Sequence, residues 1–358
     1  MATKINIALD CMGGDKAPQI VIEGADLVAS NNHNIHFLFF GNSKKILPIV
    51  NNCRYLKGRY DLIHTEEMVS SDEKPSNALR RLTQSSMRLA IDAVKDGRAD
   101  VIISAGNTGA LMAIAKVVLK TLPSIDRPAI VTSIPNKKNG GTVFLDMGAN
   151  IECDASVLFQ FAVMGRAFAR SVLKIDNPKI GVLNVGSEEL KGHDHVKNVA
   201  NLLRNSDLKN DFYGYVEGDD IVKGTVDVVV TDGFTGNITL KTIEGTVKFI
   251  SGIVKEGFTS SIWSKIGYLL ASNSLNKATK KVDPRMHNGA MLVGLNGVVI
   301  KSHGSTDGLG FANAIKVAIS LIENKINEKI INEIESNQTA INHAFAQTNS
   351  TQSESESN

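Results

Sequence analysis

The sequence predicts an α/β protein with a largely parallel sheet. Three observations indicate this fold class: short apolar runs rich in β-branched residues, little strict alternation of apolar and polar residues within them, and a helical pattern after most of them. Strands that are apolar at successive positions are covered on both faces, as in parallel sheets. Strands that alternate with helices favour a Rossmann-like α/β/α sandwich.

The expected strands are spread along most of the chain, and each ends near Gly, Asn, Asp or Ser. No linker-like composition interrupts the chain before about residue 335, so we expect a single domain over residues 1–335. Residues 336–358 lose the apolar period and are rich in Ser, Thr, Gln, Asn and Glu, which predicts a disordered polar tail. The expected strands lie within residues 4–10, 35–41, 99–107, 128–134, 141–150, 179–186 and 226–233.

Composition and charge exclude several classes of protein. The three cysteines, Cys11, Cys53 and Cys153, lie too far apart for a CxxC or Cys/His cluster, which argues against a disulfide framework and a zinc site. A net charge of +2 gives no reason to expect nucleic-acid binding. The N-terminus does not have the pattern of a signal peptide, and about 18 apolar residues nowhere run without a charge. We therefore expect a soluble protein in the reducing cytoplasm.

Six loops that follow expected strands combine glycine with small hydroxyl or amide residues. Glycine allows close backbone approach, and the N–H groups at a following helix N-terminus favour an anion. Each loop alone has the composition of an ordinary turn, but we expect all six to converge on one edge of the sheet, which predicts a site for phosphate or another oxyanion. The sequence has no GxGxxG motif after a strand and no GxxxxGK[ST] motif, which disfavours NAD and ATP. The loops span residues 11–18, 104–110, 146–154, 184–194, 231–237 and 301–310.

Six motifs lie in and around these loops: DCMGGDKAP, SAGNTGALMA, LDMGANIECD, LNVGSEELKG, VVVTDGFTGNITLKTIEG and GLNGVVIKSHGSTD. In this order, from about residue 4 to 330, they resemble the motifs of the phosphate acyltransferases. The resemblance implies that inorganic phosphate attacks the thioester of a fatty acyl chain on acyl carrier protein, giving acyl-phosphate and free carrier without a cofactor or metal. It also implies a homodimer with a fold related to phosphotransacetylase and isopropylmalate dehydrogenase, and a product used by a membrane glycerol-3-phosphate acyltransferase in phospholipid synthesis.

Phosphorolysis requires phosphate to be held in line with the carbonyl, its charge to be balanced and the oxyanion to be stabilised. We predict catalytic roles for Asn107, Lys241 and His303; the imidazole would donate to the oxyanion or protonate the thiolate, unless it is only hydrogen-bonded to backbone. Asp15 and Asp232 are either site residues or helix caps. Cys11 and Cys153 are either acyl acceptors or, preferably, packing residues. The predicted phosphate-binding or substrate-binding residues are Gly13, Gly14, Asp15, Ser104, Gly106, Thr108, Gly109, Lys191, Asp232, Gly236, Asn237 and Ser302.

Two helical segments suggest contacts outside the domain. Residues 154–172 are apolar or small on nearly every face, which indicates either a dimer interface or ordinary core burial, with Asp154 as the expected N-cap.

Residues 252–283 form an amphipathic segment, and positions 255–281 carry five lysines and one glutamate. This pattern suits an anionic membrane surface, although core packing or a site for acyl carrier protein would produce a similar one. The predicted membrane contacts are Phe258, Ile262, Trp263, Lys265, Ile266, Leu269 and Leu270.

The leading hypothesis is therefore a cofactor-free acyltransferase in the cytoplasm, peripherally associated with the inner face of the cell membrane. A phosphotransacetylase that uses acetyl-CoA is the nearest enzymatic alternative, since it would share the phosphorolysis chemistry. A non-catalytic membrane scaffold for lipid-synthesis enzymes is the alternative from another class.

Overall fold

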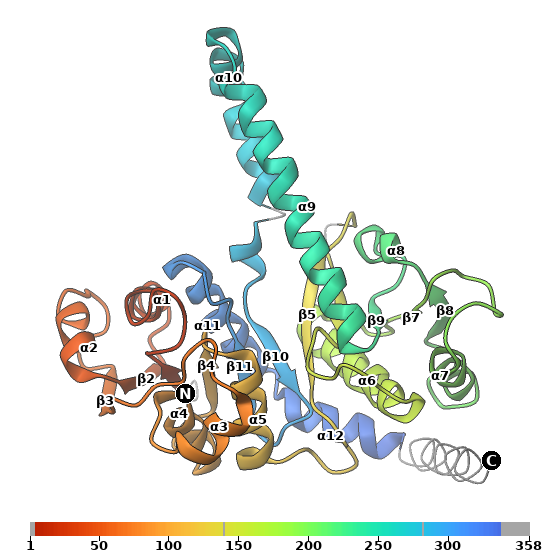
Figure 1. Ribbon diagram of the computed structural model, residues 1–358, viewed down its shortest axis with the longest axis horizontal. Helices are drawn as coiled ribbons and strands as arrows, with labels where there is room; N and C mark the ends of the chain where they lie inside the picture. The colour runs from red at the N-terminus through yellow and green to blue at the C-terminus, as the bar shows by residue number, and fades with distance from the viewer. Residues whose placement is uncertain (1–3, 139, 281–282, 338–358) are drawn as a thin grey trace.

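The computed structural model describes residues 4–138, 140–280 and 283–337. An eleven-stranded sheet runs through this part of the chain in the order β3-β2-β1-β4-β11-β10-β5-β6-β9-β7-β8 (Figure 1). The tail predicted at 336–358 lies outside the described residues from position 338 onward. The strands are β1 Ile5–Asp10, β2 Ile35–Gly41, β3 Tyr60–His64, β4 Val101–Ser104, β5 Ala129–Pro135, β6 Gly141–Leu145, β7 Ile180–Leu183, β8 Phe212–Val216, β9 Val228–Val230, β10 Ala290–Val293 and β11 Val298–Lys301.

The sheet consists of two parallel groups of strands that run in opposite directions. β1, β2, β3, β4 and β11 are parallel to one another, and β6, β7, β8 and β9 form the second parallel group. Between the groups, β10 is antiparallel to β11 and β5, and β5 is antiparallel to β6. The α/β prediction is confirmed. The expectation that all six loops share one sheet edge is wrong, because this reversal turns the second group around.

Helices cover both faces of the sheet, which explains why its strands are apolar at successive positions. Ile7 and Leu9 pack in one buried cluster with residues of α1, α6, α7, α11 and α12, whereas Ala8 belongs to a second cluster with residues of α4, α5 and α8. The helices are α1 Gln19–Ala29, α2 Ser43–Val50, α3 Pro75–Arg81, α4 Ser86–Lys95, α5 Thr108–Leu119, α6 Ala155–Phe168, α7 Asp194–Arg204, α8 Gly218–Lys223, α9 Gly233–Thr259, α10 Ile262–Lys280, α11 Gly308–Glu323 and α12 Ile326–Ser336, with a π-helical segment Ala169–Leu173 and a 3-10 turn Pro284–His287.

Helix α6 is buried within its own chain. Asp154 caps it, since the carboxylate accepts from the Val157 N–H at 2.9 Å, as predicted. Every residue of the helix except Arg166 is buried, and α6 contacts α7, α12 and β9. Core burial, the second of the two interpretations for residues 154–172, therefore accounts for the apolar pattern, and the pattern gives no support to a homodimer.

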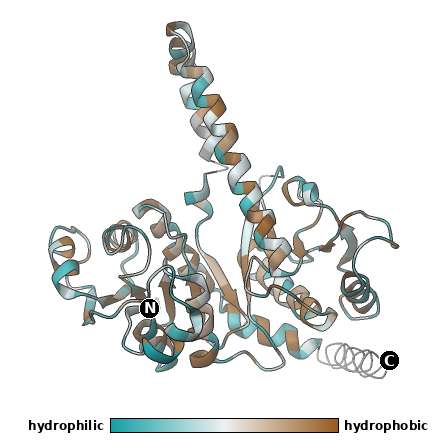
Figure 2. Ribbon diagram, viewed as in Figure 1, coloured by the Kyte–Doolittle hydropathy of each residue, from teal (hydrophilic) through white to brown (hydrophobic). Residues whose placement is uncertain are grey.

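Helices α9 and α10 contact each other and form a hairpin that extends away from the sheet (Figure 1). The amphipathic segment expected over 252–283 crosses the turn of this hairpin, so it is not one helix; residues 281 and 282 lie outside the described part. Most of its large apolar side chains are exposed, with Trp263 at 78% and Leu270 at 83%, whereas Phe258 is partly buried against the Tyr268 ring. Figure 2 shows hydrophobic residues along both helices. The core-packing alternative for this segment is therefore wrong. No described helix is long and apolar enough to span a bilayer.

Candidate active site

A buried carboxylate, Asp10, links the ends of β1 and β4 to the start of α4 at one edge of the sheet. β1, β4 and β11 are adjacent and parallel, so the loops that follow them meet. Asp10 at the end of β1 accepts hydrogen bonds from the Ser104 and Ser86 hydroxyls, each at 2.6 Å. The Ser104 hydroxyl in turn accepts from the Gly106 N–H at 3.0 Å. This network fixes the backbone after β4, although Asp10 and Ser86 were absent from the sequence-based site.

The glycine loop after β1 packs directly on this network. A Cβ atom on Gly13 would lie 2.5 Å from the Asp10 Oδ2 atom and 2.7 Å from the Gly106 nitrogen, so only glycine fits. Gly14 has a φ of +105°, which favours glycine. The Asp15 N–H donates to the Gly304 carbonyl at 3.0 Å, which ties this loop to the one after β11. The structure thus brings residues 13–15, 104–106 and 302–304 together, and their binding of phosphate stays a prediction.

The Asn107 side chain is engaged by the protein itself. Its oxygen accepts from the Ala110 N–H at 3.0 Å and caps α5, while its amide group donates to the Ser71 and Glu73 carbonyls at 3.0 and 2.9 Å. A direct phosphate contact would require these bonds to be exchanged. What Asn107 does provide is a positioned N-terminus of α5, where the free N–H groups of Thr108 and Gly109 favour an anion.

A cationic group flanks the same edge. Lys301, the last residue of β11, donates through Nζ to the Ser302 and Ala105 carbonyls. Burial lowers the pKa of Lys301 to about 8, and the nearby Asp10 charge opposes that shift. Lys241 on α9 is exposed and pairs with Glu244 at 3.0 Å, and its charge also lowers the pKa of Lys301. Helix α9, which follows β9 of the second group of strands, therefore places the positive charge of Lys241 near the end of β11 in the first group.

The contacts of His303 define which of its ring nitrogens carries the proton. Its Nδ1 atom accepts from the Ser305 N–H at 3.2 Å, so in the neutral ring the proton is on Nε2. Burial, more than any neighbouring charge, lowers the pKa of His303. The backbone N–H of His303 donates to Asn288, whose amide donates to the buried Ser302 hydroxyl at 2.8 Å. A neutral ring with a proton on Nε2 can donate to an oxyanion, and it is poorly suited to protonate a thiolate.

The remaining predicted site residues belong to the second group of strands. Asp232 caps α9 by accepting from the Thr235 N–H at 2.8 Å, so the capping interpretation holds for this residue. Gly236 allows close packing, since a Cβ atom there would lie 1.8 Å from the Asp146 carbonyl oxygen. Asn237 lies against the loop after β6, since a Cβ atom added to Gly148 would be 3.3 Å from the Cβ atom of Asn237. Lys191 pairs with Glu188 in its own loop at 2.7 Å and is half exposed.

The family is decided by comparison with known proteins. A family model described as "Fatty acid synthesis protein" matches residues 5–329. A phosphate acyltransferase of Rhodospirillum centenum is 52% identical over 98% of this chain and 99% of its own. One from Paramagnetospirillum magneticum is 51% identical over 94% of this chain and 95% of its own. The chain belongs to the phosphate acyltransferase family. It is therefore an acyltransferase of fatty acid and phospholipid synthesis, and the predicted family and enzyme class are confirmed.

Solved structures support the fold predicted for a phosphate acyltransferase. A phosphotransacetylase from Streptococcus pyogenes matches with a TM-score of 0.56 at 19% identity, over 90% of this chain and 94% of that chain. The EutD phosphotransacetylase from Staphylococcus aureus matches with a TM-score of 0.54 at 16% identity, over 87% and 94%. These identities are too low to carry function, so they establish the shared fold alone.

The cysteines of this phosphate acyltransferase family member are poor candidates for an acyl-enzyme intermediate. Burial raises the pKa of the Cys153 thiol to about 12 and that of Cys11 well above its usual range. A thiol held protonated is a weak nucleophile. The packing interpretation of both residues therefore fits the structure. Among the described residues, no three His, Cys, Asp or Glu side chains are grouped as metal ligands.

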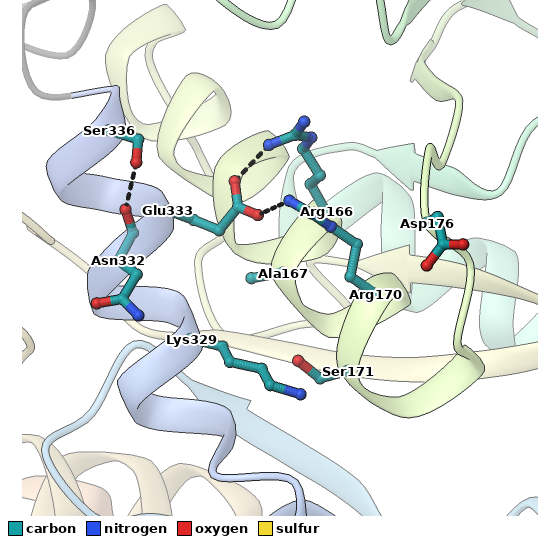
Figure 3. Close-up of a pocket in the computed structure, with 9 residues that line it drawn as sticks. All are labelled: Arg166, Ala167, Arg170, Ser171, Asp176, Lys329, Asn332, Glu333 and Ser336. Atoms are coloured by element: carbon teal, nitrogen blue, oxygen red, sulfur yellow. Dashed lines mark hydrogen bonds and ion pairs between the residues drawn. The ribbon is translucent and has the colours of Figure 1, made fainter.

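A hollow of about 480 Å³ between α6 and α12 has a structural explanation (Figure 3). In Figure 3 the Glu333 carboxylate points between Arg166 and Arg170, and it pairs with both. Arg166 also pairs with Asp211 at 2.8 Å. These ion pairs connect α12 to the core. Because the carboxylates balance the arginine charges, the hollow offers little unpaired positive charge to bind an anionic substrate.

Proposed function

We propose that this protein transfers a fatty acyl group from acyl carrier protein to inorganic phosphate, which yields acyl-phosphate and free carrier. The observation that carries the proposal is the joined edge of β1, β4 and β11. There a glycine loop, the N-terminus of α5, Lys301 and His303 lie around one network centred on Asp10. Such a site offers backbone N–H groups and a partly buried cation to a phosphate dianion.

In the proposed reaction, a phosphate oxygen attacks the thioester carbonyl carbon and forms the new C–O bond. Lys301 and the loop N–H groups hold the other phosphate oxygens, with Lys241 adding positive charge from α9. The Nε2–H group of His303 donates to the oxyanion of the tetrahedral intermediate. When that intermediate collapses, the C–S bond breaks and the carrier leaves as a thiolate, which takes its proton from water. The chain needs no cofactor or metal for these steps.

A thiol-release assay tests the proposed function. Purified protein is incubated with hexadecanoyl acyl carrier protein or with acetyl-CoA, each with and without phosphate, and free thiol is followed. We expect phosphate-dependent release from the acyl carrier protein. Activity confined to acetyl-CoA would favour a phosphotransacetylase, and release that ignores phosphate would exclude phosphorolysis.

We infer that the tip of the α9–α10 hairpin contacts an anionic membrane surface, so that a cytoplasmic enzyme delivers acyl-phosphate close to a membrane glycerol-3-phosphate acyltransferase. Ile262, Trp263, Leu269 and Leu270 are each more than 70% exposed, and Lys265 lies among them. Apolar side chains and lysines on one exposed element suit an anionic bilayer.

Liposome cosedimentation tests this membrane contact. Ile262→Asp with Leu269→Asp is expected to abolish cosedimentation with anionic vesicles and to leave activity in solution unchanged. Asn273→Asp with Ser274→Asp adds the same charge at exposed polar positions of α10 and is the matched control. Retained vesicle binding together with weakened binding of acyl carrier protein would assign the hairpin to the carrier.

We also propose a homodimer, and the exposed apolar side chains lower on α9 offer a surface for it. Phe249, Ile250, Ile253 and Val254 are 44–67% exposed and repeat at helical spacing. Sedimentation equilibrium is expected to give a dimer for the wild type and a monomer for Ile250→Glu with Val254→Glu. A monomeric wild type would exclude the dimer.

A further inference from the structure

A hollow of about 230 Å³ lies next to the glycine loop, at the carboxyl ends of β1 and β2. Gly14 and Asp15 form part of its wall, so it adjoins the loop to which the proposed function assigns phosphate binding. It is distinct from the charged cluster of Figure 3, which α6 and α12 enclose. The remaining lining includes Met12, Ala17, Pro18, Ile46, Met68 and Lys45.

The lining of this hollow combines apolar side chains, two of them methionines, with the polar residues Asp15, Asn42 and Lys45. Met12 is held in place, since its sulfur accepts a hydrogen bond from the Asn42 N–H at 3.3 Å. A Cβ atom on Gly41 would lie 2.8 Å from the Met12 Cγ atom, so glycine at the end of β2 makes room for this side chain. Met68 is 45% exposed, and Ile46 is fully buried. Methionine adapts to flexible apolar ligands because it is unbranched and polarizable.

Two charged residues, Asp15 and Lys45, are among those that line the hollow. Asp15 and Lys45 are exposed, whereas Cys11 is buried and its thiol is directed to the Leu9 carbonyl at 3.5 Å. A ligand with an apolar body and one polar reacting end therefore matches this arrangement. An acyl thioester has that form, since its carbonyl is polar and its chain is not.

We propose that this hollow receives the methylene groups next to the thioester carbonyl of a long-chain acyl substrate. The proposal rests on the proposed function, because it places the carbonyl at the glycine loop. The volume of about 230 Å³ is several times the roughly 30 Å³ that one water occupies in the liquid, so it accommodates several methylene groups and not a whole long chain. The distal part of the chain continues past Met68 into solvent or onto the carrier.

Chain-length specificity tests the subsite. The kcat/KM for phosphate-dependent thiol release is measured with butanoyl, octanoyl and hexadecanoyl acyl carrier protein. For the wild type we expect a rise of about fourfold per methylene over the first several that are buried, followed by a plateau. Met68→Trp adds bulk at this position, and Met68→Gln makes it polar at nearly the same size. Leu47→Trp is the matched control, because Leu47 lies on α2, is 39% exposed and does not line the hollow.

We expect both Met68 variants to lose at least about tenfold in kcat/KM with the octanoyl and hexadecanoyl substrates and to stay within about twofold of the wild type with the butanoyl substrate. The Leu47 variant should keep the wild-type profile. Unchanged profiles in both Met68 variants would overturn the subsite. An equal loss at all chain lengths would assign the hollow to the carrier arm and overturn it as well. A wild type without phosphate-dependent release would instead refute the proposed function on which the subsite rests.

Discussion

Replacing Lys301 by methionine tests two effects of its charge: how much the charge destabilises the folded protein, and how much it contributes to phosphate binding. Methionine has a similar reach and an apolar stem, but it cannot carry a charge or donate to the Ala105 and Ser302 carbonyls. Burial lowers the pKa of Lys301 from 10.5 to about 8. At neutral pH the folded protein therefore keeps an ammonium group charged in a place that disfavours the charge.

The pKa difference sets the size of this cost. At about 1.36 kcal/mol per pKa unit, a drop from 10.5 to about 8 destabilises the fold by about 3 kcal/mol at pH 7. Because the folded pKa lies below the unfolded one, the penalty is complete below pH 8 and disappears as the pH rises through 10.5. Between pH 7 and about 9.5, the wild type should therefore gain about 2 kcal/mol of stability relative to Lys301→Met.

Urea unfolding of the wild type and the variant at pH 7 and 9.5 measures this difference. The hydrogen bonds lost in the variant change its free energy of unfolding by the same amount at both pH values, so their contribution cancels when the two pH values are compared. In parallel, the KM for phosphate at pH 7 should rise at least about tenfold in the variant, as expected for one lost charge-assisted hydrogen bond. A stability difference that is the same at both pH values would refute the buried charge. An unchanged phosphate KM and kcat would refute its role in the site.

The other predictions concern the core, the oxyanion and the glycine loop. Glu333→Gln should lower the free energy of unfolding by about 3 kcal/mol in urea, because it breaks a partly buried ion-pair cluster, whereas the exposed Glu328→Gln should change it little. His303→Ala should reduce kcat by about 10²–10³ in the thiol-release assay. Since its pKa is lowered, His303 should add no ionisation to the rate profile above pH 7. Gly13→Ala should raise the phosphate KM with little change in circular dichroism, because its methyl group displaces Asp10; wild-type kinetics would contradict the tight contact.

Seven of the eleven described strands were predicted from sequence; β3, β8, β10 and β11 were not among the expected strands, and the strand directions could not be predicted. Residues 4–10, 35–41 and 99–107 contain β1, β2 and β4, since apolar β-branched runs between turn residues specify buried strands locally. β5 has the same kind of sequence and lies antiparallel to both of its neighbours. Burial on both faces produces the same apolar run in either direction, so the reversal at β5 and β10 depends on pairing between distant segments.

The candidate site was predictable where local backbone chemistry defines it. Gly13 and Gly14 stand out in the sequence because close approach and positive φ favour glycine. Lys301 does not stand out, because a lysine that ends an apolar strand is usually a solvated boundary residue, and only the packed neighbours bury it. Asn107 does stand out in the sequence, but its role could not be predicted. An asparagine after a strand can either contact a bound ligand or cap the following helix, and only the contacts in the structure distinguish the two roles.

Helix α9 also sets the distance between the proposed catalytic site and the proposed membrane contact at the hairpin tip. It starts after β9, and Ser260 at the hairpin turn lies 19 residue steps beyond Lys241, which at 1.5 Å per residue is roughly 28 Å. With the proposed contact between the hairpin tip and a membrane, and with the hairpin upright, the proposed site would lie above the bilayer at a height close to the thickness of the hydrocarbon layer. The proposed acyl-phosphate product would then have to cross water to reach the membrane, so the proposed downstream enzyme would have to extend toward the site or the product would have to travel along the hairpin.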